Sequence, residues 1–152
     1  MMRFCFVVFL LWSGLAHSQS KIDSLKTAYE NTSISSEKFT ILDQLTTELV
    51  RANSHEQEKY LRFYIKLASD LGEYDLMASK SRFLIQHYIY QNELRKAKNL
   101  CDSLLNLKTN FKAFNSEAHL LLKRGAIFYN QDSLSKANKV SFDFKKSSKD
   151  LV

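Results

Sequence analysis

The chain has 152 residues, with 22 Lys and Arg against 16 Asp and Glu, a net charge of +6, 3 glycines and no proline. It is long enough for one domain with a hydrophobic core, and its composition excludes general disorder and collagen-like, linker-like or disulfide-scaffold chains. Tight β turns depend on Gly and Pro whereas long helices need neither, so the composition predicts an all-helical protein.

The first 18 residues have the pattern of a secretory signal peptide. Arg3 supplies a positive start, residues 4–12 are an unbroken apolar run, and small residues precede a cut between Ser18 and Gln19. The alternative is an N-terminal membrane anchor, but the run is shorter than the roughly 20 residues that a spanning helix needs. We therefore expect an exported chain, periplasmic or secreted, whose mature part (19–152) has no membrane span.

The mature chain has the spacing of successive helices, because apolar residues recur at three and four positions without strict alternation. The predicted helices cover residues 22–29, 36–52, 55–71, 75–91, 93–107 and 117–130, and a seventh begins at Asp132. The sixth helix is expected to turn Leu121, Leu122 and Phe128 toward the core. Connections of only a few residues predict that neighbouring helices are antiparallel.

Turn and cap residues mark several of these helix ends. Ser54 and Gln57 have the spacing of a capping box at the start of the third helix, and Gly72 is placed to end that helix. Asn92 is expected to cap the fifth helix, and Asn115 or Ser116 the sixth.

Two helix pairs share a spacing that indicates a repeat. Tyr88 precedes Ala97 by nine residues, and Phe128 precedes Ala137 by the same nine. This step sets a large residue late in one helix against a small residue early in the next, where the two helices cross closely. Ala97 and Ala137 are 40 residues apart, a period that predicts stacked helical hairpins.

The stretches FLIQHYIYQNELRKAKNLCDSLL and LLLKRGAIFYNQDSLSKANKVSFDF resemble the helix A, turn and helix B of the tetratricopeptide repeat (TPR) family. Gly125, Phe128 and Ala137 occupy the places of that family's small, aromatic and alanine residues. The chain departs from the family pattern at Ile85, where a small residue belongs, and in lacking the turn glycine and the proline. The stretch LASDLGEYDLMASKSRFL is also similar to the junction between repeats in bacterial sensor proteins. The chain as a whole resembles the exported N-terminal repeat region of Bacteroidetes-type sensor and regulator proteins.

The resemblance covers about residues 36–147. It implies antiparallel helical hairpins stacked as a short right-handed solenoid of about three repeats. Residues 19–35 would then be a short helix and linker, and residues 148–152 a tail. The alternative is an unrelated all-α bundle.

Motifs for catalysis or metal binding are mostly excluded. The mature chain has only Gly72 and Gly125, so a P-loop, a GxGxxG dinucleotide site and a GxSxG elbow are impossible. His55 and Glu56 begin like a zinc-protease HExxH motif, but position 59 is Lys59. We expect no cofactor and no metal.

The single mature cysteine, Cys101, falls on the inner stripe of the fifth helix and is expected to be a small buried hydrophobe. The alternative is a nucleophile that pairs with His87 or His119. Those two histidines are isolated, which favours partly exposed or core-edge positions.

Basic residues concentrate in the second half of the chain. Residues 95–152 hold 12 Lys and Arg against 5 Asp and Glu, whereas residues 19–94 hold 9 against 11. Such a surface attracts an acidic peptide, an anionic membrane or a nucleic acid, but a nucleic acid does not suit an exported chain without a tight basic run. The alternative is a lysine-rich solvated face.

In the resembled family, helix A residues line a concave groove that holds a peptide. Carried onto the registers of Tyr88 and Phe128, the resemblance implies a set of partner-binding residues: Ser79, Arg82, Gln86, Tyr90, His119, Tyr129 and Asn130. Arg and Tyr are enriched in binding hot spots, which favours Arg82, Tyr90 and Tyr129. The alternative for the two tyrosines is packing between neighbouring hairpins.

The last predicted hairpin closes near Lys146 without the polar capping helix that solenoids use. A homodimer through this hairpin would cover Phe142 and Phe144. The sequence thus predicts an exported, non-enzymatic scaffold that binds a protein or peptide. The alternative is a truncated sensory region of a membrane-bound regulator, of the histidine kinase or DNA-binding type, without its output domain.

Overall fold

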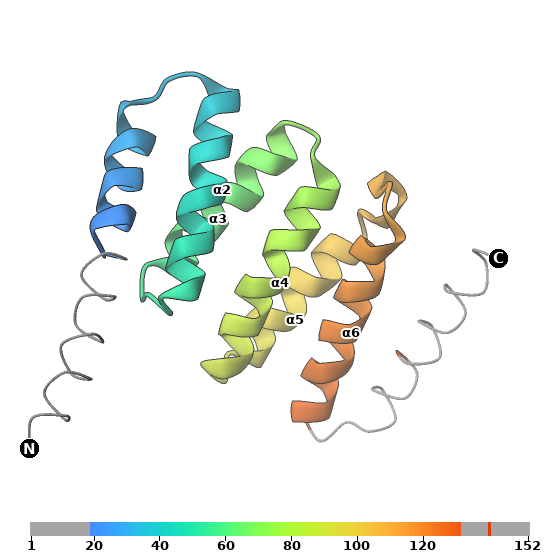
Figure 1. Ribbon diagram of the computed structural model, residues 1–152. Helices are drawn as coiled ribbons and strands as arrows, with labels where there is room; N and C mark the ends of the chain where they lie inside the picture. The colour runs from blue at the N-terminus through green and yellow to red at the C-terminus, as the bar shows by residue number, and fades with distance from the viewer. Residues whose placement is uncertain (1–18, 132–139, 141–152) are drawn as a thin grey trace, which may run out of the picture. The chain divides into compact units, whose positions relative to one another are not determined.

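The computed structural model describes residues 19–131 and residue 140, which Figure 1 draws as a succession of helices. These residues include no strand, which confirms the predicted all-α class. Residues 19–31 are helical. The later helices are α2 (Ser35–Arg51), α3 (Gln57–Asp70), α4 (Tyr74–Tyr90), α5 (Leu94–Leu105), the short 3-10 helix η1 (Lys108–Asn110) and α6 (Phe114–Asn130). The predicted signal peptide, the tail and all of the seventh helix except Val140 lie outside the described residues.

The chain divides into two compact units, the first ending at Tyr60 and the second beginning at Leu61. The apolar core of the first unit comes from the helical segment 19–31, α2 and the first turn of α3, and consists of Ile22, Leu42, Leu45, Leu49 and Tyr60. Beside this core Glu48, only 8% exposed, pairs with Lys21 at 2.8 Å and with Arg51 at 2.9 Å. The apolar stripe of α2 forms most of this core, and the Lys21–Glu48 pair joins the segment 19–31 to α2.

In the second unit α4 packs against both α5 and α6, and α5 also packs against α6. The fully or nearly fully buried residues of these helices include Leu84, Ile85, Tyr88, Ala97, Cys101, Leu104, Leu120 and Ile127. Tyr88 and Ala97, the large and small residues of the predicted nine-residue step, are 2% and 0% exposed. At the edge of this unit Phe128 and Leu121 form a buried cluster with Val140.

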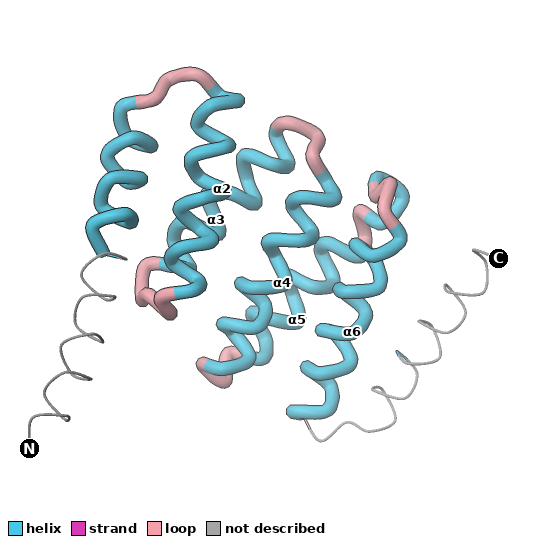
Figure 2. Tube along the Cα trace, in the orientation of Figure 1, coloured by secondary structure: helices cyan, strands magenta, loops and turns pink. Residues whose placement is uncertain are grey.

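Three of the turns between helices have one backbone design, and Figure 2 shows how short they are. A residue with positive φ ends each preceding helix: Asn53 (48°), Gly72 (72°) and Asn92 (57°). The next N–H donates to a carbonyl five residues back, in the pairs Ser54–Leu49 (2.9 Å), Glu73–Ala68 (2.8 Å) and Glu93–Tyr88 (2.8 Å). This is the Schellman motif, which favours Gly or Asn because other residues clash at positive φ. Gly72 therefore ends α3 as predicted. The cap assignment for Asn92 is wrong, since Asn92 closes α4 and makes no cap for α5.

The predicted capping box at α3 is half right. The Ser54 hydroxyl accepts the backbone N–H of Glu56 at 3.3 Å, so it does satisfy a donor near the helix start. The return bond differs, because the Ser54 N–H is already committed to the preceding turn. The Gln57 amide donates instead to the Asn53 side chain at 3.4 Å.

The α6 helix begins at Phe114, three residues before the predicted start, and neither Asn115 nor Ser116 caps it. Its start is held by Asp75, in the first turn of α4. The Asp75 carboxylate accepts the N–H of Lys112 at 3.0 Å, the N–H of Ala113 at 3.2 Å and the Ser116 hydroxyl at 2.6 Å. A carboxylate 41 residues away from Ser116 in the sequence thus accepts the hydrogen bonds at the start of α6 that a local cap residue was expected to accept.

One core prediction for α6 is wrong. Leu122 is 57% exposed, whereas Leu120 and Ile127 are completely buried. Leu120 and Ile127 lie seven positions apart and so share a stripe that Leu122 does not belong to. The helix therefore has more apolar residues than its buried face can hold.

Candidate functional site

The predicted partner-binding residues lie on α4 and α6, which are in contact in the second unit. Tyr90 is 80% exposed and Tyr129 is 68% exposed, so neither ring packs against another described helix. Ser79, His119 and Asn130 are also exposed, while Arg82 and Gln86 are half-buried. The Asn130 side chain donates to the Ala126 carbonyl of its own helix at 2.7 Å.

Two cations lie at the boundary between these helices. Lys123 of α6 donates from Nζ to Oε1 of Gln86 on α4. Burial lowers the pKa of Lys123, and the nearby charge of Arg82 lowers that pKa further. Arg82 stacks over the Phe83 ring at 4.6 Å, and its buried Nε has no hydrogen-bond partner in the described part of the chain.

Within residues 19–131, neither Arg82 nor Lys123 forms an ion pair with a carboxylate. Two cations held near each other favour a bound anion, and burial makes that preference stronger than it would be in water. Tyr90, Leu122 and Tyr129 add exposed apolar surface on the same two helices. We call Arg82, Gln86, Tyr90, Leu122, Lys123 and Tyr129 together the α4/α6 face.

Lys123 was missing from the residues implied by the sequence, although the sequence held a signal for it. It follows His119 by four positions and precedes Asn130 by seven, which places all three on one stripe of a helix. The pairing with Gln86 could not be read in the same way, because it depends on how α4 and α6 pack.

In a second charged cluster, on α5 and α6, two cations share one carboxylate. Asp102 of α5 accepts Lys98 Nζ at 2.6 Å and lies 3.0 Å from Nε of Arg124 on α6. The Arg124–Asp102 pair joins the two helices, and both cations of this cluster have a carboxylate partner. Among the basic residues of this unit, those near Asp102 are therefore structural.

Cys101 is completely buried, which confirms the prediction of a small core residue. Its thiol donates to the Leu120 carbonyl at 3.1 Å. Burial raises the pKa of Cys101 to about 12, and the charge of Asp102 adds to the rise. The thiolate needed for nucleophilic attack is therefore suppressed at neutral pH.

The described residues contain no cluster of three or more His, Cys, Asp or Glu side chains suited to a metal ion. None of their helices combines the length and hydropathy required to cross a bilayer.

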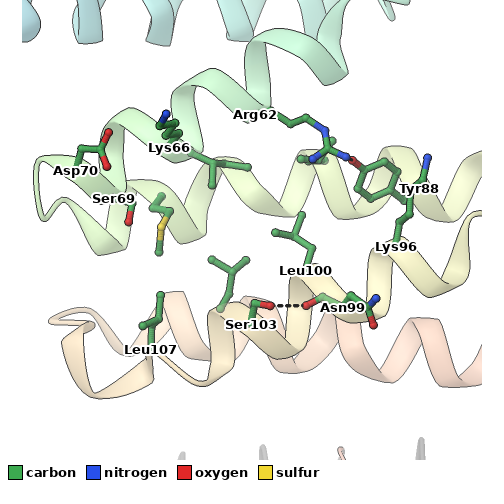
Figure 3. Close-up of a pocket in the computed structure, with 14 residues that line it drawn as sticks. Arg62, Lys66, Ser69, Asp70, Tyr88, Lys96, Asn99, Leu100, Ser103 and Leu107 are labelled. Atoms are coloured by element: carbon green, nitrogen blue, oxygen red, sulfur yellow. Dashed lines mark hydrogen bonds between the residues drawn. The ribbon is translucent and has the colours of Figure 1, made fainter.

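The second unit also has a groove of about 570 Å³ between α3 and α5, with α4 as its floor. Figure 3 shows Arg62, Tyr88 and Lys96 together at one end, with Ser69, Asp70 and Leu107 toward the other. Leu84 and Leu104, buried at 1% and 3% exposure, belong to its apolar lining. This groove could not be predicted from the sequence, because residues of three separate helices form it. We call it the α3/α5 groove.

No protein-family model, curated protein sequence or solved structure matches this chain.

Proposed function

We propose that this chain is an exported, non-enzymatic helical scaffold that binds an acidic segment of a protein or peptide on the α4/α6 face. The observation that carries the proposal is the pair of cations, Arg82 and Lys123, without a carboxylate partner in the described residues. A carboxylate placed between them would reduce their repulsion and supply an acceptor for the buried Arg82 Nε. Exposed Tyr90 and Tyr129 provide the kind of side chains that anchor protein partners.

As the framework for this face, we propose TPR-like hairpins stacked as a solenoid of about three repeats. Support comes from the tight turn at Asn92 between α4 and α5 and from the contacts of α4 with both α5 and α6. The burial of Tyr88 and Ala97 at their expected positions adds to it. In such an array the first helix of each hairpin would contribute to the binding surface.

The test uses the full chain, labelled with ¹⁵N, and an acetylated peptide of alternating Asp and Leu. A peptide of alternating Lys and Leu with the same length is the control ligand. We expect the acidic peptide alone to shift amide signals near Gln86, Tyr90 and Lys123. The Arg82→Gln and Lys123→Gln variants are each expected to weaken binding about tenfold, the size of a lost charge-assisted hydrogen bond.

Arg95→Gln is the matched variant, because Arg95 is exposed on α5 and lies outside the face. It should leave the affinity within about twofold of the parent chain. Equal losses for Arg95→Gln and Arg82→Gln would reduce the effect to net charge and remove the proposal. Signal shifts confined to other helices would remove it as well.

A further inference from the structure

The α3/α5 groove has a positively charged end and a mainly apolar remainder, and none of its lining residues belongs to the α4/α6 face. At one end the Tyr88 ring lies between two cations, with Arg62 at 5.7 Å and Lys96 at 5.6 Å from its centroid. Arg62 also donates to the Tyr88 hydroxyl at 2.6 Å. The two cations come from α3 and α5, so the groove gathers positive charge where its two walls meet the floor (Figure 3).

The groove lining holds more basic than acidic residues. Its basic residues are Arg62, Lys66 and Lys96, and its acidic residue is Asp70. Glu93, just outside the lining, pairs with Lys96 at 2.7 Å. That pair is half-exposed on both sides, so it is weak and an incoming anion can compete for Lys96.

Beyond the cationic end the lining is mainly aliphatic. Leu84 and Met77 form part of the floor, and Leu100 and Leu104 come from the α5 wall. Ser69 and Ser103 are small and leave space between α3 and α5 that larger side chains would fill. From Lys96 to Leu104 the α5 wall extends about 12 Å at the rise of an α-helix.

We propose that the α3/α5 groove binds a small amphiphile with one anionic head and an unbranched apolar body, such as an alkyl carboxylate. The head pairs with Lys96 at the cationic end, beside Tyr88, and the body lies along Leu100 and Leu104 over Leu84. The groove volume of about 570 Å³ is within the usual range for small-molecule sites. This site is separate from the α4/α6 face and does not depend on the function proposed for that face.

The test is calorimetric titration of the full chain with dodecanoate, kept below its micelle-forming concentration. Dodecan-1-ol has the same apolar body without the charge, and acetate has the charge without the body. We expect saturable binding of dodecanoate with one ligand for each chain, and affinities at least about tenfold lower for the other two compounds.

Two pairs of variants locate the ligand. Lys96→Glu is expected to weaken dodecanoate binding at least about tenfold, while Arg95→Glu, the same charge change next to the groove, costs less than about threefold. Ser103→Phe fills the groove and is expected to abolish binding, whereas Asn106→Phe lies outside the lining and is expected to preserve it. Ser69→Phe fills the groove from α3 and replaces Ser103→Phe if circular dichroism shows that variant to be unfolded.

Several results would overturn the proposal. They are the absence of saturable binding, equal affinity for dodecan-1-ol, equal losses for Lys96→Glu and Arg95→Glu, or full binding in both groove-filling variants. Loss of dodecanoate binding in Arg82→Gln with no loss in Lys96→Glu would move the ligand to the α4/α6 face and also refute the site.

Discussion

The two units of the chain use charged side chains in different ways. In the first unit Lys21 and Arg51 converge on the buried Glu48, and Lys26 pairs with Glu56. On the α4/α6 face of the second unit, Arg82 and Lys123 have no carboxylate partner among the described residues. The comparison shows that the position of the carboxylates matters more than the number of cations. A cation beside a carboxylate forms a structural ion pair, whereas a cation without one can bind an anionic ligand.

The largest change in stability is expected from Glu48→Gln in the first unit. The substitution leaves Lys21 and Arg51 without the anion that they both contact, and we expect a loss of about 1–3 kcal/mol in the free energy of unfolding. Urea denaturation measures this loss. Glu30→Gln, at an exposed acid of the same unit, should stay within about 0.5 kcal/mol of the parent chain. Equal effects of the two variants would contradict a structural role for the Glu48 pairs.

Asp75→Asn tests how much a structural carboxylate contributes in the second unit, where Asp102 is another of this kind. The Asp75 oxygens accept hydrogen bonds from the N–H groups of Lys112 and Ala113 and from the Ser116 hydroxyl, and the substitution replaces one of these oxygens with an amide donor. We expect the free energy of unfolding, measured by urea denaturation, to fall by about 1–2 kcal/mol. Asp70→Asn is the control, since an exposed acid in the last turn of a helix is unfavourable to begin with. A destabilisation by Asp70→Asn as large as that by Asp75→Asn would show that the anchor contributes little.

Both structural carboxylates make stability depend on pH. The hydrogen bond from Lys21 lowers the pKa of Glu48; burial opposes this, and the charge of Arg51 supports it. Burial raises the pKa of Asp75, but the hydrogen bonds from Ser116, Ala113 and Lys112 outweigh it and leave this pKa lowered. A lowered folded-state pKa gives stability that is complete above the ordinary pKa and is lost as the pH falls through the folded-state value.

The stability advantage of the parent chain over Glu48→Gln and over Asp75→Asn should therefore narrow when urea denaturation is repeated from about pH 6 down to about pH 3. An advantage that stayed constant or widened over this interval would contradict the assignment.

The smallest effect on stability is expected from Arg82→Gln, because Arg82 forms no ion pair with a carboxylate among the described residues. The free energy of unfolding should change by no more than about 0.5 kcal/mol, in either direction. The pKa of Lys123, followed by NMR of the side chain, should rise toward its ordinary value and stop short of it, because burial is the larger cause of its depression. A large destabilisation would place Arg82 with the structural charges and erase the contrast between the units.

Much of the fold could be predicted from local pattern. The starts and ends of α2, α4 and α5 agree with the predicted ranges to within two residues, because hydrophobic spacing and turn residues act over short distances. The role of the turn residues could not be predicted from local pattern alone. Asn suits both a helix N-cap and a left-handed turn, and Asn92 adopts the left-handed turn.

The errors in α6 have a different origin. Its start depends on Asp75, far away in the sequence, and the choice between Leu120 and Leu122 as core residue depends on where α4 and α5 lie against it. No window along the chain contains that information. Element type was therefore predictable where local spacing decides it, and the details were not where tertiary contacts decide them.

The candidate sites follow the same rule. The stripe of α4 that holds Arg82, Gln86 and Tyr90 could be named from helical spacing and a family resemblance. The role of Lys123 depends on a bond across two helices, and the α3/α5 groove depends on three helices at once. Binding residues that share one helix could be predicted from the sequence, whereas sites formed between helices could not.

The Asp75 anchor also bears on the order in which the second unit folds. Turns such as those at Gly72 and Asn92 connect helices that follow each other, and such local contacts form quickly. The bond between Asp75 and Ser116 spans 41 residues, so it waits until α5 has folded back and the connection to α6 has closed. Interactions that form after the rate-limiting step mainly slow unfolding, so we expect Asp75→Asn to speed unfolding more than it slows folding.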